Sequence, residues 1–413
     1  MKNNFKKVSF LTIQKVLINA IFFSPFFGLI SFGKISSLSI TLPLLSLALF
    51  LVISFIGFLT NNICISKTRF FFSISFILLC LISCFVNPYR SNITSLSLYF
   101  FFFSIPIFID RRLKLTSFQK SLKVFIFLTV VFSLYSMYQF YAYNFLPSAP
   151  LKELIPSQLW VDDMNVVTSI HGYSIFGKEV IRSHSIYSEP SIFSQFNAIA
   201  ILLLLCSKGS FSKVYFFSSI IILAAGLVCS LSGTGLIILI IGGIYLFVSS
   251  KNKITLSLMA VPLCVIFLIL LLNGRGDLFS YFAGRAFEIS RTDTSYTSGY
   301  YRFVLPFQFG FNHLLGFGVG NDDIALLSIN AYESTISNGF GKVFTELGIV
   351  GLIMIVAFFL IGYPKGRNKR HIKLFLIVTI TLNIVGTFMA PMFWCFAVPY
   401  ICLTQTRNDY LRP

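Results

Sequence analysis

The chain has 413 residues, of which 56% are hydrophobic and 11% charged, with a formal net charge of +18. A soluble domain of this length would carry roughly 25% charged residues, so that class is excluded. Apolar stretches of about 17–22 residues recur from end to end, each long enough to cross a hydrocarbon core of about 30 Å. Such solidly apolar runs also lack the alternation of a β-barrel. The sequence predicts an all-α polytopic membrane protein, a single integral membrane domain over 1–413.

About 12 transmembrane helices are predicted, taken in chain order. Their ranges are 14–33, 38–60, 70–87, 93–109, 122–146, 189–206, 214–231, 233–249, 254–273, 339–361, 373–389 and 391–405. Most connections between them are short. Two long loops, 147–188 and 273–338, both fall on the same predicted side, and long loops with their own composition usually carry function.

The basic charge is distributed unevenly between the two predicted sides of the membrane. One side receives 22 Lys and Arg and 2 Asp and Glu, and the other receives 10 and 12. Cytoplasmic connections are the ones enriched in Lys and Arg. Both termini are therefore expected in the cytoplasm, with the two long loops outside. The charge signals topology and gives no reason to expect a nucleic-acid partner.

The segment Arg182 to Ser194 places an arginine, a histidine, a glutamate and several hydroxyls where a membrane helix begins. Ionisable groups at a bilayer are costly and call for a functional explanation. Glu189-Pro190 also fits an ordinary helix start with Ser188 as the N-cap. The two interpretations are compatible, because a carboxylate at that point could act as a general base or orient one. Glu189 is the favoured candidate and His184 its rival.

The second long loop holds arginines at 275, 285, 291 and 302, with His313 nearby. Guanidinium groups bind phosphate oxygens through two parallel hydrogen bonds, so a group of them facing the outer leaflet suits an anionic ligand. An arginine in an outer loop is individually unremarkable. Four arginines in one loop are notable, because the chain has few other basic residues on the predicted outer side. They favour a phosphate-binding role for at least one of the four.

Two glycine-containing segments resemble functional motifs, but the surrounding sequence argues against a functional role for each. The segment 230–235, Ser-Leu-Ser-Gly-Thr-Gly, is expected to be a tight re-crossing with close helix contact, with a role in lining a glycan path as the alternative. The segment 316–320, Gly-Phe-Gly-Val-Gly, lacks the βαβ context of a dinucleotide site. The histidines have no metal-ligand spacing, and no Walker loop is present. We therefore expect no metal, no cofactor and no use of ATP.

Three places in the chain resemble the O-antigen polymerase (Wzy) group of the O-antigen polymerase/ligase superfamily. One is Arg182 followed by Glu189-Pro190-Ser191-Ile192-Phe193 at a helix start, and another is the Ser-Gly-Thr-Gly turn at 232–235. The third runs from Tyr301-Arg302 through Leu315-Gly316-Phe317-Gly318 to Asn338-Gly339-Phe340 and Glu346-Leu347-Gly348-Ile349-Val350-Gly351. With the predicted spans and loops, the resemblance covers most of the chain.

The resemblance implies a metal-independent glycosyltransferase of the C-type membrane fold, in the bacterial inner membrane with its active site in the periplasm. Such an enzyme moves a glycan from undecaprenyl pyrophosphate to a sugar hydroxyl on another lipid-linked repeat unit, with a chain-length regulator as a partner. Glu189 or His184 would be the base. Arg182, Arg285, Arg291 and Arg302 would bind the pyrophosphate, and His313 and Asn338 are further candidates.

Two alternatives follow from the same residues. An O-antigen ligase would transfer the polymer to lipid A core, but its usual histidine-asparagine pair is Ser337-Asn338 here, without the histidine. A flippase for lipid-linked oligosaccharides would place charged residues along a central path through many helices. In this sequence the charges gather in two outer loops, which favours an enzyme over a transporter.

Overall fold

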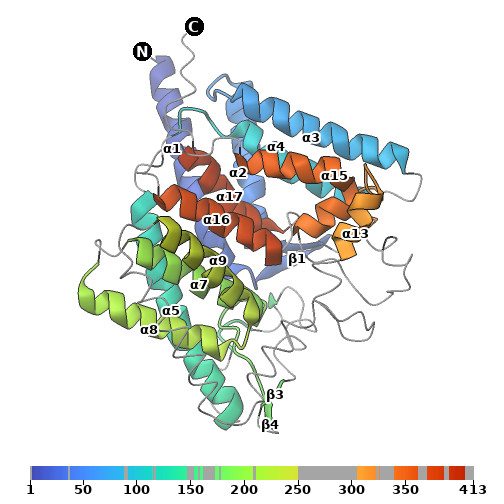
Figure 1. The fold of residues 1–413 in the computed structure, drawn as a ribbon. Helices are drawn as coiled ribbons and strands as arrows, with labels where there is room; N and C mark the ends of the chain where they lie inside the picture. The colour runs from blue at the N-terminus through green and yellow to red at the C-terminus, as the bar shows by residue number, and fades with distance from the viewer. Residues whose placement is uncertain are drawn as a thin grey trace.

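The computed structural model describes residues 2–35, 38–87, 92–113, 115, 118–146, 153–156, 159–160, 173–175, 178–207, 211–249, 305–321, 325, 339–360, 370–385 and 390–404. This described part is predominantly helical (Figure 1). The predicted span 254–273 lies outside it.

Five of the described helices are long and apolar enough to cross a membrane. They are α1 (Lys2–Phe23, continued by the 3-10 turn η1, Ser24–Phe27), α2 (Leu42–Leu59), α3 (Lys67–Val86), α5 (Phe118–Phe145) and α15 (Gly339–Leu360). The shorter described helices are α4 (Ile93–Phe108), α7 (Pro190–Cys206), α8 (Lys213–Cys229), α9 (Gly233–Ser249), α13 (Leu305–Asn312), α16 (Arg370–Val385) and α17 (Pro391–Thr404). The described part of the chain is mostly helical and fits an all-α membrane protein, and the count of twelve crossings stays a prediction.

Two short antiparallel hairpins interrupt the helical pattern. Strands β1 (Ser31–Ile35) and β2 (Leu38–Thr41) join α1 to α2, and β3 (Tyr173–Ile175) and β4 (Lys178–Val180) lie in the first long loop. The predicted spans 14–33 and 38–60 were therefore wrong at their facing ends. Residues 31–33 and 38–41 are apolar enough to extend a helix, but they pair as strands. Helix α2 begins only where Pro43 supplies a first-turn residue.

Helix α7 lies inside the bundle. Every residue from Phe193 to Leu205 is buried, so the helix is covered on all sides, as expected for one that is hydrophobic all round. It contacts α5, α8, α9 and α16. In Figure 1, α5, α7, α8 and α9 form one side of the molecule, and α3, α4, α13 and α15 form the other.

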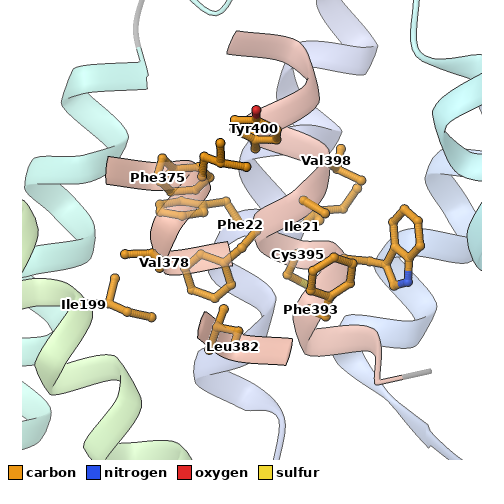
Figure 2. Close-up of a cluster of buried hydrophobic side chains, with 14 of the residues drawn as sticks. Ile21, Phe22, Ile199, Phe375, Val378, Leu382, Phe393, Cys395, Val398 and Tyr400 are labelled. Carbon is orange, nitrogen blue, oxygen red and sulfur yellow. The ribbon is translucent and has the colours of Figure 1, made fainter. Parts of the chain in front are cut away.

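Helices α1, α16 and α17 form the apolar centre between these two sides. Phe22 of α1 packs its ring against Phe375 of α16 and Phe396 of α17, with centroids 6.1 and 5.7 Å apart. Figure 2 shows this cluster reaching α7 through Ile199. Ser24, after the end of α1, contacts Cys395 near the start of α17, so these two helices run antiparallel.

The described connections that the sequence places outside contact one another. Ile30, just before β1, forms an antiparallel bridge with Trp160 of the first long loop. Farther along that loop, the Ser183 amide donates to the Cys229 carbonyl at the end of α8, at 3.2 Å. The α1–α2 connection, the first long loop and the α8–α9 turn are thus linked by direct contacts.

The connections α2–α3 and α4–α5, predicted inside, meet around a buried carboxylate. Asp110 is fully buried and accepts from Arg112 Nε at 2.9 Å and from the Cys64 amide at 3.2 Å. Its own amide donates to Gln14 of α1 at 3.3 Å, and Arg112 also donates to the Asn62 carbonyl at 2.7 Å. One charged residue therefore ties three segments together.

Helix α15 is broken at Gly348, which has φ 63° and ψ −160°. Residues 313–321, the connection that follows α13, cross the helix at this break. A Cβ on Gly348 would stand 2.3 Å from the carbonyl oxygens of both His313 and Leu314. The break exists because only glycine tolerates this conformation and this close approach of two backbones.

We predict that Gly348→Ala lowers the free energy of unfolding by about 3 kcal/mol or more, from backbone strain and overpacking together. Gly233→Ala, at the start of α9 where a Cβ would meet nothing within 4 Å, is the matched control. Unfolding in detergent measures both. Equal midpoints for the two variants would contradict the role given to Gly348.

Candidate functional site

Residues 181–189, here called the strap, connect β4 to α7 and run along one face of α5. The amide and carbonyl of Ile181 pair with the side chain of Asn144, both at 2.9 Å. The hydroxyls of Ser183 and Ser136 are 2.5 Å apart and both residues are fully buried. A segment without helical hydrogen bonds is thus satisfied by the polar side chains of a neighbouring helix.

Gln139 of α5 anchors the middle of the strap. Its Oε1 accepts from the backbone amides of His184 at 3.1 Å and Ser185 at 2.7 Å. Ser185 has φ 58°, a left-handed conformation that is uncommon for a residue other than glycine. The amide group of Gln139, which is fully buried, therefore holds the turn at which the strap bends.

The imidazole of His184 is fully buried and engaged at both ring nitrogens. Its Nδ1 lies 2.5 Å from the Tyr187 carbonyl and its Nε2 lies 3.2 Å from Glu153 Oε1. A carbonyl only accepts, so Nδ1 carries a hydrogen. His184 is therefore placed to hold the strap together, and its nitrogens are turned away from solvent.

Tyr187 packs the strap onto the apolar interior of the bundle. Its side chain is almost fully buried and its ring packs on Phe26, Phe193 and Phe196. Burial raises the pKa of Tyr187 well above its ordinary value. The phenol therefore stays protonated at physiological pH and cannot serve as a base.

Glu189 is the exposed ionisable group of the strap. It occupies the N-cap position of α7 with Pro190 in the first turn, so the expectation that Ser188 is the N-cap was wrong. Its side chain makes no capping hydrogen bond, and its Oε2 instead accepts from the Ser191 hydroxyl at 2.7 Å. A carboxylate held in this way faces the surrounding medium while its backbone is fixed by the helix.

Arg182 lies between two residues that hydrogen bonds hold in place. Ile181 is bonded to Asn144, and Ser183 is bonded to α5 and to the Cys229 carbonyl. Its half-buried side chain therefore starts from a fixed backbone position. Arg182, His184 and Glu189 therefore lie on one segment whose backbone is held by α5.

The Ser-Gly-Thr-Gly turn at 232–235 packs directly on the start of α7. Thr234 Oγ1 donates to the Ser191 carbonyl at 3.0 Å, and the Gly235 amide donates to Ser194 Oγ at 3.1 Å. A Cβ on Gly235 would stand 2.4 Å from the Ser194 carbonyl oxygen. The prediction of close helix contact through small residues is confirmed, and the contact fixes the start of α7, at whose N-cap Glu189 lies.

His313 lies in a different part of the molecule. It is exposed in the 313–321 connection, and its ring lies 4.3 Å from that of Phe317. Gly316, Gly318 and Gly320 of this connection all have positive φ. A Cβ on Gly316 would lie 2.3 Å from the Glu346 carbonyl carbon. Gly316 permits a close backbone crossing, and Gly318 and Gly320 lie against neighbouring side chains, so packing explains the glycines without a nucleotide.

Four predicted site residues lie outside the described part of the chain, namely Arg285, Arg291, Arg302 and Asn338. Arg302 precedes the first residue of α13, Leu305, by three positions, and Asn338 directly precedes α15. Their proposed roles stay predictions.

Sequence reasoning missed Gln139 and Glu153. Gln139 sits within an apolar run, in a row of buried polar residues on α5 with Thr129, Ser133 and Ser136. That spacing of four, three and three is helical, and it could have indicated a polar stripe facing another segment. No local pattern marks Glu153 in the same way. It contacts His184 from a distant part of the first long loop, and such a contact leaves no trace in the local sequence.

Within the described ranges, no three His, Cys, Asp or Glu side chains gather in a way that could hold a metal ion. A scan against protein-family models and a search of curated proteins both gave no match.

We predict that Gln139→Leu destabilises the protein by about 2–4 kcal/mol, because two buried strap amides lose their acceptor. Gln119→Leu, at an exposed position in the first turn of α5, controls for the same change of side chain. Thermal unfolding in detergent measures the difference. A shift no larger than that of the control would mean that Gln139 does not hold the strap.

Proposed function

We propose that the protein is an inner-membrane polysaccharide polymerase that uses repeat units linked to undecaprenyl pyrophosphate. It transfers the glycan of one carrier to a sugar hydroxyl of another repeat unit on the periplasmic face. The observation that carries the proposal is the geometry of Glu189, an exposed carboxylate at the start of the buried helix α7 on a strap fixed by α5.

The chemistry requires one bond to form and one to break. The acceptor hydroxyl oxygen bonds to the anomeric carbon of the donor glycan, and the bond from that carbon to the pyrophosphate oxygen breaks. The hydroxyl proton passes to a base, and the electron pair leaves on the pyrophosphate. Because the donor bond is already activated, the transfer itself consumes no nucleotide.

Glu189 suits the role of the base better than His184. Its carboxylate is exposed, and its hydrogen bond from Ser191 fixes one oxygen and leaves the other for a substrate proton. His184 is buried with both ring nitrogens engaged, so its part is to hold the strap on which Glu189 and Arg182 are mounted. General bases contribute roughly 10²–10⁴-fold to such reactions.

Cations must meet the pyrophosphate as negative charge develops on it. Arg182 lies on the same strap as Glu189, and we assign it this role among the described arginines. Arg285, Arg291 and Arg302 complete the proposed set. Substrates carried by lipids reach the site laterally, which a helical bundle with its site at the helix ends permits.

We predict that Glu189→Gln lowers the rate of polymer formation by at least about 100-fold with unchanged protein level, because the amide keeps the size of the side chain but cannot take a proton. Glu179→Gln, in β4 of the same loop, is the control. Polymer length on a gel and protein level by immunoblot measure the result. Full-length polymer from the Glu189→Gln variant would remove Glu189 from the mechanism.

The cellular experiment compares lipopolysaccharide from a deletion strain with that from the same strain carrying the gene. The polymerase proposal expects core bearing a single repeat unit and no ladder in the deletion strain. Bare core with polymer kept on the carrier would instead indicate the ligase. Accumulation of single units on the cytoplasmic face would indicate a flippase.

A further inference from the structure

Helix α13, in the second long loop, exposes an aromatic face. Phe307 and Phe311 are four residues apart, which places them on one face of the helix, and they are 38% and 69% exposed. Leu314, two residues beyond the helix end, is 66% exposed. Large apolar side chains exposed together on one short segment indicate a contact surface.

The buried side of α13 is fitted closely to α15. The Phe344 ring of α15 packs against the rings of Phe307 and Phe311, with centroids 5.4 and 5.1 Å apart. A Cβ on Gly310 would stand 2.4 Å from the Phe344 side chain. Figure 1 shows α13 at one end of α15. This packing fixes the orientation of α13, so the exposed parts of Phe307 and Phe311 belong to the surface of the molecule.

Helices α3 and α15 run antiparallel, and they provide a scale of depth for α13. Near the start of α3, the Phe72 ring meets that of Phe358 near the end of α15, with centroids 5.4 Å apart. Near the end of α3, Ser83 Oγ donates to the Glu346 carbonyl of α15 at 3.1 Å. Ser83 and Glu346 are therefore at the same level along the two helices.

The aromatic face of α13 is level with the exposed end of α3. Phe344 is two residues closer to the start of α15 than Glu346, a rise of about 3 Å. In the antiparallel helix α3, the same rise beyond Ser83 reaches Phe85, which is 86% exposed, and Ile82 beside it is exposed too. Helix α3 is long and apolar enough to cross a membrane, so its exposed apolar side chains are expected to face hydrocarbon.

The other residues of the segment suit the edge of the hydrocarbon. Gln308 and Asn312 are exposed beside the aromatic face, and the exposed His313 follows them. Residues 305–320 contain no Asp, Glu, Lys or Arg, so no charged side chain opposes a position near lipid. Helices that lie in a membrane interface bury an apolar face about 5–10 Å into the boundary between headgroups and acyl chains and keep polar side chains in the headgroups.

We propose that α13 is an interfacial helix that inserts Phe307, Phe311 and Leu314 among the phospholipid acyl chains of the outer leaflet. The observation that selects acyl chains as the occupant is the depth that this face shares with the exposed apolar end of α3. The inserted helix holds the 313–321 connection and the start of α15 at the membrane surface. The inference does not depend on the proposed polymerase activity.

The test measures tryptophan fluorescence of the full-length protein in nanodiscs whose phospholipids carry bromine, a quencher, on their acyl chains. Trp160 and Trp394 are buried, so the unsubstituted protein supplies the background. Bromine is expected to remove at least about half of the fluorescence added by Phe311→Trp, because the side chain lies at the acyl boundary. Phe85→Trp on α3 is the positive control. Leu154→Trp, at an exposed position of the first long loop, should lose much less.

Leu314→Trp is a second reporter, so that failure of one variant to fold leaves the test intact. Quenching like that of Phe85→Trp at position 314 would support the inference even in a protein that makes no polymer. Quenching no stronger than that of Leu154→Trp, in both reporters and in folded protein, would overturn it.

Two further measurements distinguish other occupants of the same face. Added undecaprenyl phosphate should leave the quenching by brominated phospholipid unchanged. Loss of that quenching would overturn the inference, because the face would then bind the carrier chain. The mass of the detergent-solubilised protein should be the same for Phe311→Ser and the unsubstituted chain. A dimer that Phe311→Ser dissociates would show instead that two copies meet through this face.

Discussion

The structure depends on one constraint: backbone amides and carbonyls of non-helical segments inside an apolar bundle must find hydrogen-bond partners. Unpaired amides and carbonyls at membrane depth cost several kcal/mol each, so irregular segments persist only where protein groups replace water. The polar stripe of α5 meets this requirement for the strap through Asn144 and Gln139. The strap is consequently rigid, and the residues that it carries have fixed positions relative to α7.

The break in α15 obeys the same constraint in another way. Carbonyls that the broken helix no longer uses accept from the amides of the 313–321 connection and from Ser83. Glycines at 316 and 348 permit the backbones to approach closely enough for these bonds. The strap and the 313–321 connection are thus two irregular segments on the side predicted to face outward. Polar contacts fix both of them, and both carry ionisable residues.

Much of the helical architecture follows from hydrophobic run length alone, as α3, α5 and α8 illustrate. The hairpin β1–β2 could not be predicted in this way, because Phe32, Ile35, Leu38 and Ile40 continue the apolar runs on either side and strand pairing is not visible in run length. At the site, the local sequence indicated Glu189 and Arg182. The partners of His184 lie 45 and 31 residues away in the chain, at Gln139 and Glu153. No local pattern contains such contacts.

Glu346 shows a further limit of local reasoning. In the sequence it belongs to a helix with glycines every few residues, and only the fold shows that it meets Tyr99 of another helix. The contacts of this buried carboxylate with α4, like those of His184 with α5, come from segments distant in the chain, so only the fold reveals them.

The most direct test of the central claim is reconstitution of the purified chain in lipid vesicles with a lipid-linked single repeat unit as the sole glycan substrate. Without nucleotide, the account predicts a ladder of polymer and release of one undecaprenyl pyrophosphate for each glycosidic bond formed. A stable monomeric substrate, in vesicles where the protein is folded and correctly oriented, would contradict it.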